Sequence, residues 1–280
     1  MISVIIPVYN EEQAVEETVR HVKRVMDSTR KTYEIIAVND GSTDRSLEIL
    51  KRMSFVKIIN NPYNLGYGAS IKKALVAAEH EWILILDADG TYPIQDIPKL
   101  LLYTGYDMVV GARTKNPHIP LFRIPAKKIL TALARFLTGK NIPDLNSGLR
   151  LFRKGIAMKF FNLFPQGFSF TTTLTIACLT NEYTVKFVPI RYFRRKGVSS
   201  VKPFRDFKNF CMLIIRLMTY FRPMRMFGLV SAVLIMGAGL VFAYSFFILH
   251  KLMDISVIVL IVAALQIFLF GALAELTIRK

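Results

Sequence analysis

Residues 82–90 read WILILDADG, so a run of five apolar residues leads directly into Asp87 and Asp89. A short apolar run that ends in polar residues is typical of a buried strand. Two carboxylates two positions apart at a strand end can reach one hard cation, and Mg²⁺ and Mn²⁺ prefer such oxygen ligands together with phosphate oxygens and water. Asp-x-Asp alone is common in loops, but its position after a strand favours a Mg²⁺ or Mn²⁺ site at Asp87 and Asp89 that stabilises a departing diphosphate.

On both sides of this stretch, short apolar runs alternate with helical patterns. We expect strands at 2–6, 33–38, 56–59, 82–86 and 108–110, and helices at 11–26, 69–78 and 42–51, the last capped by Ser42 or Thr43. This alternation predicts an α/β fold with a mostly parallel sheet and helices on both faces, and ligands then bind at the carboxyl ends of the strands.

Three polar clusters fall at those carboxyl ends. They are residues 7–11 (PVYNE), 39–42 (NDGS) and 87–90 (DADG). Because the carboxyl ends of parallel strands meet at one edge of a sheet, the three clusters predict a single crevice. Residues 66–71 (GYGASI) begin like a dinucleotide-binding fingerprint, but they lack its third glycine and do not follow the first strand.

The C-terminal part of the chain is strongly apolar. Residues 226–249 contain no charge, and residues 255–277 contain only Glu275. Each run is long enough to cross a bilayer about 30 Å thick as a helix. We expect a transmembrane hairpin, while the alternative of two buried core helices is disfavoured because core helices rarely lack a polar face over such lengths. The mean hydropathy of +0.37 agrees with a chain that lies partly in lipid.

The formal net charge of +17 is concentrated in the middle of the chain. Residues 113–225 hold 22 Lys and Arg against 3 Asp and Glu, whereas residues 1–112 hold 12 against 15. Such a block is typical of proteins that bind nucleic acid, an anionic membrane or a phosphorylated substrate. The apolar runs that follow the block favour membrane lipids and a phosphorylated substrate, and we expect no nucleic acid partner.

Basic residues flank the expected hairpin on one side. Residues 216–225 hold three arginines before the first span, and Arg279 and Lys280 follow the second. The positive-inside rule then predicts a two-span integral membrane protein with both termini and the N-terminal domain in the cytoplasm. The first twelve residues form too short an apolar run for a secretory signal.

Two further segments have a basic amphipathic pattern. They are residues 122–137 and 204–221, and we expect both to lie at the membrane surface, although helices that merely cover the sheet remain an alternative. The predicted organisation is a domain at 1–203, a juxtamembrane segment at 204–225 and a transmembrane hairpin at 226–280, with spans at about 226–249 and 255–277.

The polar motifs together resemble a known enzyme family. Residues 5–11 (IIPVYNE), 38–44 (VNDGSTD), 64–69 (NLGYGA) and 87–89 (DAD) are similar in order and spacing to the family 2 glycosyltransferases, which have a GT-A fold. Residues 111–113 (GAR), 144–150 (DLNSGLR) and 195–199 (RKGVS) resemble the dolichyl-phosphate mannose synthase branch and its bacterial polyprenyl-phosphate relatives. The resemblance covers about residues 1–205.

The resemblance implies roles for individual residues. It implies a nucleoside site at Pro7, Tyr9, Glu11, Val38 and Asp40, and a metal and diphosphate site at Asp87, Ala88 and Asp89. It also implies that arginines hold the donor diphosphate and the acceptor phosphate, at Arg113, Arg123 and Arg195, with Lys196 as the alternative to Arg195. A purely membrane-facing role for these basic residues is the competing interpretation.

The resemblance implies inverting transfer of a hexose from a nucleotide diphosphate sugar, of the GDP-mannose or UDP-glucose type, to dolichyl or undecaprenyl phosphate at the cytoplasmic membrane face. A phosphate monoester is already an anion at neutral pH, so its attack requires charge compensation more than a general base. Alternatives are transfer to another membrane lipid or glycan, for which Asp144 is the one acidic candidate base in the basic third, and a non-catalytic membrane subunit that binds sugar nucleotides. A homo-oligomer is compatible with the sequence.

Overall fold

The computed structural model describes residues 1–115, 124–167, 169–193, 203–248, 250 and 255–278. The chain forms two compact units, Met1–Phe210 and Cys211–Lys280.

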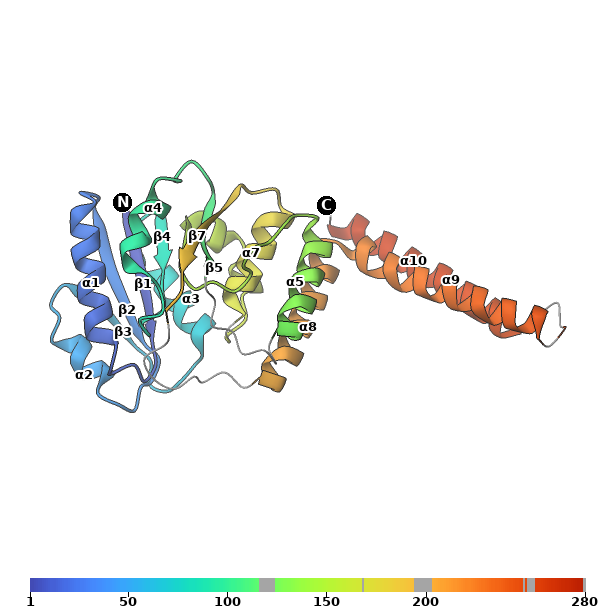
Figure 1. Ribbon diagram of the computed structural model, residues 1–280, viewed down its shortest axis with the longest axis horizontal. Coiled ribbons are helices and arrows are strands. Elements are labelled where there is room, and N and C mark those ends of the chain that lie inside the picture. The colour runs from blue at the N-terminus through green and yellow to red at the C-terminus, as the bar shows by residue number, and fades with distance from the viewer. Residues whose placement is uncertain (116–123, 168, 194–202, 249, 251–254, 279–280) are drawn as a thin grey trace. The chain divides into compact units, whose positions relative to one another are not determined.

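The first unit is built on a seven-stranded sheet with the order β3-β2-β1-β4-β6-β5-β7 (Figure 1). The strands are β1 Ile2–Val8, β2 Tyr33–Asn39, β3 Val56–Asn60, β4 Trp82–Ile85, β5 Met108–Lys115, β6 Arg150–Arg153 and β7 Val185–Arg191. β1 pairs in parallel with β2 and β4, while β6 is antiparallel to both β4 and β5. The prediction of a mostly parallel α/β sheet is confirmed, but the sequence analysis did not predict β6 or β7.

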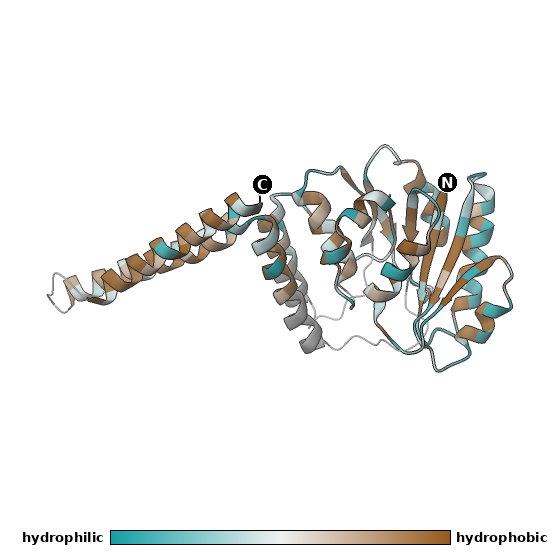
Figure 2. Ribbon diagram, turned by 180° about the vertical axis from the view of Figure 1, so that it is seen from behind, coloured by the Kyte–Doolittle hydropathy of each residue, from teal (hydrophilic) through white to brown (hydrophobic). Residues whose placement is uncertain are grey.

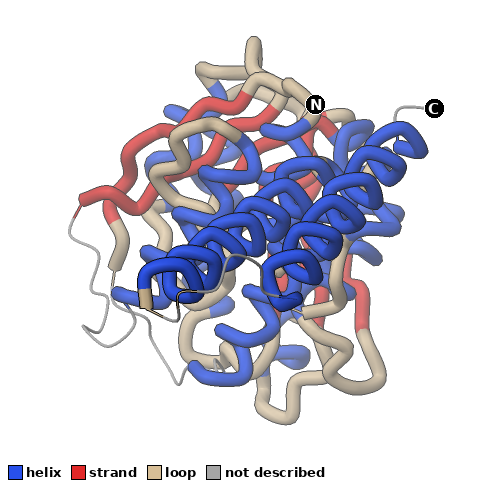
Figure 3. Tube along the Cα trace, turned by 90° about the vertical axis from the view of Figure 1, so that its right-hand side faces the viewer, coloured by secondary structure: helices blue, strands red, loops and turns tan. Residues whose placement is uncertain are grey.

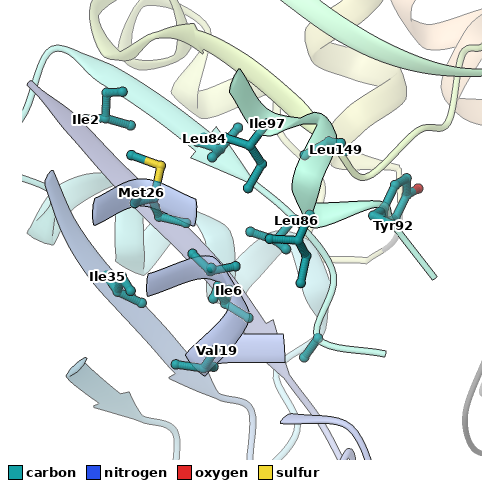
Figure 4. Close-up of a cluster of buried hydrophobic side chains, with 14 of the residues drawn as sticks. Ile2, Ile6, Val19, Met26, Ile35, Leu84, Leu86, Tyr92, Ile97 and Leu149 are labelled. Carbon is teal, nitrogen blue, oxygen red and sulfur yellow. The ribbon is translucent and has the colours of Figure 1, made fainter. Parts of the chain in front are cut away.

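Helices cover both faces of this sheet. They are α1 Val15–Ser28, α2 Ser46–Lys51, α3 Tyr67–Ala77, α4 Ile97–Leu101, α5 Ile124–Thr138, α6 Lys154–Lys159 and α7 Phe170–Thr180. On one face, Val19 and Met26 of α1 pack with Ile6 of β1 in a buried apolar cluster (Figure 4). Each such side chain stabilises the fold by about 1.5–3 kcal/mol on burial. The cluster contains residues of α1 and α4 but none of α3.

The order of the strands creates a switch point between β1 and β4. The chain moves outward from β1 to β2 to β3, and it then crosses back so that β4 lies on the other side of β1. Because such crossovers are right-handed, the reversal places α3 on the face opposite α1. Ligands of open α/β sheets bind at the carboxyl ends of the strands that flank this reversal. These are β1 and β4, which are the strands that precede the first and third polar clusters.

The predicted starts of two helices are wrong, and the helix expected over residues 11–26 begins at Val15. The helix expected over residues 42–51 begins at Ser46, and neither Ser42 nor Thr43 caps it. Ser42 Oγ instead accepts a hydrogen bond from the Asn10 backbone N–H (3.1 Å), and the Thr43 N–H donates to Asn10 Oδ1 (2.8 Å). The polar side chains after β2 therefore bind the loop after β1 rather than the end of their own helix.

The second unit contains the two long apolar helices, α9 Pro223–Phe247 and α10 Ile255–Ile278, which lie side by side (Figures 1 and 3). Both are long and apolar enough to cross a membrane, and Figure 2 shows them brown along most of their length. Ser231 Oγ donates to the Ala264 carbonyl at 2.8 Å, and Gly271 leaves room for Phe227. The chain is thus a membrane protein with two candidate spans.

The two amphipathic segments are helical, as predicted. They form α5 and α8 Pro203–Phe221. Among their described side chains, Leu137, Ile214 and Leu217 are buried within the protein, so part of each apolar stripe is a packing face. Met212 and Tyr220 of α8 are about half exposed.

Candidate active site

The structure brings the three polar clusters to one edge of the sheet. β2, β1 and β4 are parallel neighbours. The Asp40 N–H donates to the Val8 carbonyl (2.8 Å), and the Leu86 N–H donates to the Ile5 carbonyl (3.2 Å). Residues 7–11, 39–42 and 87–90 therefore leave the sheet next to one another, as the sequence predicts.

The loop after β1 and the loop after β2 form one wall of this edge. Asn10 has a φ of 55°, a left-handed conformation that asparagine tolerates, and it holds the second loop through its side chain. The Glu11 N–H donates to Ser46 Oγ at 2.9 Å. Tyr9 is exposed at the rim, whereas Glu11 is buried. Tyr9 is thus accessible to a ligand while its backbone is fixed.

Asp40 organises a further loop beneath that wall. Its buried carboxylate accepts hydrogen bonds from Asn61 Nδ2 (2.8 Å), the Leu65 N–H (2.9 Å) and the Gly66 N–H (2.9 Å). The charge of Asp40 is therefore compensated by three donors from the chain itself. Two such donors are backbone groups of the NLGYGA motif, which explains why that motif accompanies the NDGS motif in the sequence.

The other residues of the expected nucleoside site present mainly backbone peptide groups to a ligand. The side chains of Val38 and Ala88 are buried, and Pro7 is partly buried. The Ala88 carbonyl accepts a hydrogen bond from Thr18 Oγ1 of α1 at 3.1 Å. A ligand at this edge would therefore meet the peptide groups of these residues rather than their side chains.

Asp87 and Asp89 follow β4 directly, and the structure fixes both. Asp89 is buried, and its Oδ1 accepts hydrogen bonds from the Thr91 N–H (3.1 Å) and Thr91 Oγ1 (2.6 Å). Asp87 is partly exposed and lies beside the buried hydroxyl of Tyr67. Burial, with a smaller contribution from the Asp87 charge, raises the pKa of Tyr67 well above its usual value, so Tyr67 stays a neutral hydroxyl beside that carboxylate.

The glycines on either side of Tyr67 allow a close backbone approach. The Gly68 N–H donates to the Gly167 carbonyl (3.2 Å), and the Ala69 N–H donates to the Gln166 carbonyl (3.0 Å). Backbone carbonyls thus occupy the first N–H groups of α3, which in a dinucleotide fingerprint would face phosphate. Residues 66–69 (GYGA) therefore pack against residues 165–167, and this contact positions Tyr67 beside Asp87.

We expect Gly68→Ala to lower the free energy of unfolding by about 2 kcal/mol, the usual range for overpacking. A Cβ at Gly68 would lie 2.8 Å from the Gly167 carbonyl oxygen and closer still to that of Pro165. Chemical denaturation of the purified protein measures the change. Gly155→Ala on α6 is the matched control, because nothing lies within 4 Å of its new Cβ. Equal stability of both variants would contradict the close contact.

The segment before β6 also reaches the aspartates. Because β6 is antiparallel to β4, Arg150 pairs with Ile85, and the residues that precede Arg150 arrive at the carboxyl edge. A Cβ at Gly148 would lie 2.8 Å from Asp87 Oδ1, and the Gly148 N–H donates to Tyr92 Oη at 2.6 Å. Gly148 therefore leaves space at the Asp87 carboxylate. The sequence analysis noted residues 144–150 only as a family motif and did not place them beside Asp87.

Arg113 lies at the carboxyl end of β5 and is paired with Asp144. Its Nε and Nη2 donate to the two carboxylate oxygens at 2.7 and 2.9 Å, and its backbone N–H donates to Oδ2 at 3.0 Å. The guanidinium stacks on the Tyr192 ring, 5.1 Å from its centroid. Although burial opposes the charge, neighbouring Tyr92 and Asp144 raise the pKa of Arg113 above its usual value. Arg113 is thus a fixed cation, and its Nη1 makes no hydrogen bond to the described residues.

Arg150 is fully buried and ties the same segment to α7. Its guanidinium donates to the Ser147 carbonyl (2.9 Å from Nε), the Thr171 carbonyl (2.8 Å) and Thr175 Oγ1 (2.9 Å). Burial lowers the pKa of Arg150. Sequence reasoning treated this arginine as part of the basic block, but it is a structural residue.

Three expected phosphate-binding residues, Arg123, Arg195 and Lys196, lie outside the described residues. The chain reaches 194–202 from β7 through Phe193, whose N–H donates to the Thr91 carbonyl at 2.9 Å. The last described residue before Arg195 and Lys196 is therefore attached to the segment that carries Asp89.

The donor set suits a metal that is bound jointly by protein and ligand. Asp87 and Asp89 offer two carboxylates, and the described part of the chain holds no cluster of three or more His, Cys, Asp or Glu side chains suited to a metal. Mg²⁺ and Mn²⁺ are commonly held in this way by one or two carboxylates plus phosphate oxygens. A side chain at residue 148 would collide with the Asp87 carboxylate, so glycine at this position allows the carboxylate to stay where it could bind such a metal.

Comparison with known proteins identifies relatives. A family model described as glycosyl transferase family 2 matches residues 3–161. The glycosyltransferase YkcC of Bacillus subtilis is 36% identical over 159 residues, a match that spans 53% of this chain and 48% of that protein. A dolichyl-phosphate hexose transferase of Haloferax volcanii is 30% identical over 207 residues, 72% of this chain and 87% of that protein.

A second membrane-lipid enzyme and a solved structure are also similar. An undecaprenyl-phosphate 4-deoxy-4-formamido-L-arabinose transferase of Salmonella choleraesuis is 29% identical over 84% of this chain and 72% of its own length. Glucosyl-3-phosphoglycerate synthase from Mycobacterium tuberculosis, crystallised with Mn²⁺, UDP and glucosyl-3-phosphoglycerate, superposes with a TM-score of 0.60 at 19% identity, covering 78% of this chain and 79% of that one. This likeness establishes the GT-A-like fold.

Proposed function

The chain belongs to glycosyl transferase family 2, and from this premise we propose that it transfers a hexose from a nucleotide diphosphate sugar to a polyprenyl phosphate in a membrane. The observation that carries the proposal is the Asp87–Asp89 pair at the switch point, with Tyr67 beside Asp87, Thr91 hydrogen bonded to Asp89, and Gly148 packed against the Asp87 carboxylate. The two named lipid-phosphate transferases among the relatives support the acceptor, and the two candidate spans support its location.

In the proposed reaction an oxygen of the lipid phosphate attacks the anomeric carbon of the sugar. The bond from that carbon to the nucleotide diphosphate breaks, its electron pair leaves with the diphosphate, and the configuration inverts. A bound Mg²⁺ or Mn²⁺ would supply charge stabilisation to the departing diphosphate. Asp87 and Asp89 would hold that ion, and Arg113, fixed by Asp144, would direct its Nη1 toward a phosphate oxygen.

The nucleoside would lie against the wall formed by residues 7–11 and 38–40. Tyr9 supplies an exposed ring at the rim. Val38 and Asp40 at the end of β2, and Ala88 after β4, are buried and supply peptide groups. Pro7 and Glu11 border the same edge. This arrangement would leave the sugar and diphosphate near Asp87 and Asp89, on the side of the sheet where β5 carries Arg113.

The ion pair between Asp144 and Arg113 argues against a hydroxyl group as the sugar acceptor. A lipid or glycan hydroxyl would need a general base. Asp144 is 1% exposed and accepts three hydrogen bonds from Arg113, so it is poorly arranged to receive a proton from a substrate. This favours a phosphate acceptor over a hydroxyl. The intact carboxylate pair likewise favours an enzyme over a silent binding subunit.

A substrate panel tests the proposal directly. Purified protein with Mn²⁺ and undecaprenyl or dolichyl phosphate is incubated with GDP-mannose, UDP-glucose and related donors, and the lipid product is identified by mass. We expect a glycosyl phospholipid from one donor class. Products formed only on lipids with a free hydroxyl would replace the proposed acceptor, and no transfer from any donor would support the binding subunit.

We expect Arg195→Ala to slow transfer by about 100-fold, roughly 3 kcal/mol in the barrier, while donor affinity without lipid changes little. Two anions that approach each other in a partly desolvated site repel by several kcal/mol, and the arginine fork offsets this while it orients the attacking oxygen. Arg195→Lys should restore only part of the rate, and Lys196→Ala tests the alternative that this lysine holds the acceptor phosphate. A large loss of donor affinity with unchanged turnover would assign Arg195 to the donor diphosphate instead.

We also propose that residues 1–203 form the catalytic domain, 204–225 a juxtamembrane segment and 226–280 a hairpin, with both termini cytoplasmic. Arg222 precedes α9, Arg225 lies in its first turn, and Arg279 and Lys280 follow α10, which supports this orientation. Reporter fusions after Lys280 and after His250 should give opposite topologies, cytoplasmic at the first and external at the second. The same result at both positions would rule out the two-span hairpin.

A further inference from the structure

A single amide side chain, Gln266, lies at the midpoint of the apolar helix α10. With a rise of about 1.5 Å per residue, it is about 17 Å from either end of Ile255–Ile278. Its side chain is exposed, and it makes no hydrogen bond to any described residue. Its partner therefore lies outside the hairpin.

An amide at this depth cannot be satisfied by water. The hydrocarbon core of a bilayer is about 30 Å thick, and a glutamine side chain is far too short to reach either interface from its centre. A polar group left without hydrogen bonds in an apolar medium costs several kcal/mol. A second membrane-embedded polar group is the remaining source of hydrogen bonds.

Gln266 faces away from the helix that α10 already contacts. The contact with α9 uses the buried residues Ala264 and Gly271, seven positions apart. Gln266 is two positions beyond Ala264, about 200° around the helix. It lies on an outer row of exposed side chains, which consists of Val259, Val262, Gln266, Leu269 and Leu273.

The spacing of this row is that of a helix-packing seam. Its members alternate by three and four residues, as core positions of a coiled coil do, with β-branched and leucine side chains on either side of one polar residue. Apolar character alone would not select a face, because apolar residues of α10 are distributed around the whole helix. Gln266 selects it, and single buried polar residues at such positions are known to fix register and partner number.

We propose that this outer row, residues 259–273 of α10, is the contact surface for a second copy of the chain. The two copies are related by a two-fold axis along the membrane normal, and the two Gln266 carboxamides hydrogen bond to each other. A carboxamide carries both donors and an acceptor, so it is complementary to itself. A two-fold axis along the normal keeps every residue of both copies at the same depth and gives both copies the same orientation in the membrane. The inference rests on membrane insertion of α10 and not on the chemistry of the active site.

Self-association is measured on the full chain in phosphatidylcholine and phosphatidylglycerol vesicles, by energy transfer between labelled copies as the lipid is diluted. We expect Gln266→Leu to weaken association about tenfold and Gln266→Asn to retain most of it. A cysteine at Leu273 should cross-link to its counterpart on oxidation. A cysteine at Phe268, equally within the span and exposed but about 200° from Gln266, should not.

The proposal is overturned if Gln266→Leu associates as tightly as the wild type, if the wild type stays monomeric at the highest protein density, or if Phe268 cross-links in preference to Leu273. Extraction of the wild type by alkaline carbonate would remove the membrane premise itself. Sugar transfer is assayed on the same vesicles, so failure of the catalytic proposal is recorded separately.

Discussion

Asp89→Asn is expected to lower the rate of sugar transfer about 1,000-fold, roughly 4 kcal/mol in the barrier, and to abolish Mn²⁺ binding in the presence of nucleotide. The amide oxygen can still accept the two hydrogen bonds that Thr91 donates to Asp89, so the local turn is retained. Only the negative charge is lost, and with it a ligand for the cation that stabilises the departing diphosphate. Turnover and calorimetric Mn²⁺ titration measure the two effects.

Two controls separate this role from a structural one. Thr91→Val keeps the carboxylate but removes the hydroxyl donor, and we expect a loss of tenfold or less. Asp27→Asn removes an exposed carboxylate on α1 and should leave turnover unchanged. Excess EDTA should stop the wild-type reaction, and added Mn²⁺ should restore it. Full activity of Asp89→Asn, or of the chelated wild type, would exclude the proposed metal site.

Asp144→Ala is expected to lower the free energy of unfolding by about 3–5 kcal/mol, because it leaves a largely buried guanidinium without its carboxylate. The Arg113 side chain is 19% exposed and that of Asp144 is 1% exposed, so solvent can compensate neither charge fully. Transfer should fall as well, since Arg113 loses the bidentate contact that fixes its orientation. Denaturant unfolding of the detergent-solubilised chain gives the stability change.

A double-mutant cycle with Arg113→Ala provides the decisive comparison. If the two side chains form one unit, the double variant should be less destabilised than the two single changes added together. Arg153→Ala is a control, because its ion pair with Glu81 is exposed and such pairs contribute at most about 1 kcal/mol. A variant Asp144→Ala that is inactive but fully stable would instead support a general base and a hydroxyl acceptor.

The strand ends that form the candidate site can be predicted from local sequence. The runs before Pro7, Asn39 and Asp87 are apolar and short, and the polar residues follow at once, so both the strands and their ends are local features. The two candidate spans are determined in the same way, because composition over a long run needs no partner to be recognised. The resemblance to family 2 glycosyltransferases rested on these same segments.

The residues that surround the two aspartates are brought together by long-range packing, which local sequence does not reveal. β6 is four residues long and has arginine at both ends, Arg150 and Arg153, so its sequence carries no strand signal. Pairing with β4 and β5 makes it a strand, and its antiparallel direction brings Gly148 to Asp87 and Asp144 to Arg113. Arg150 is buried because carbonyls and a hydroxyl from α7 and residue 147 receive its donors. These contacts join residues that are far apart in the chain, so no local sequence pattern could predict them. They form because strand pairing and side-chain packing in the folded state lower the free energy of this arrangement.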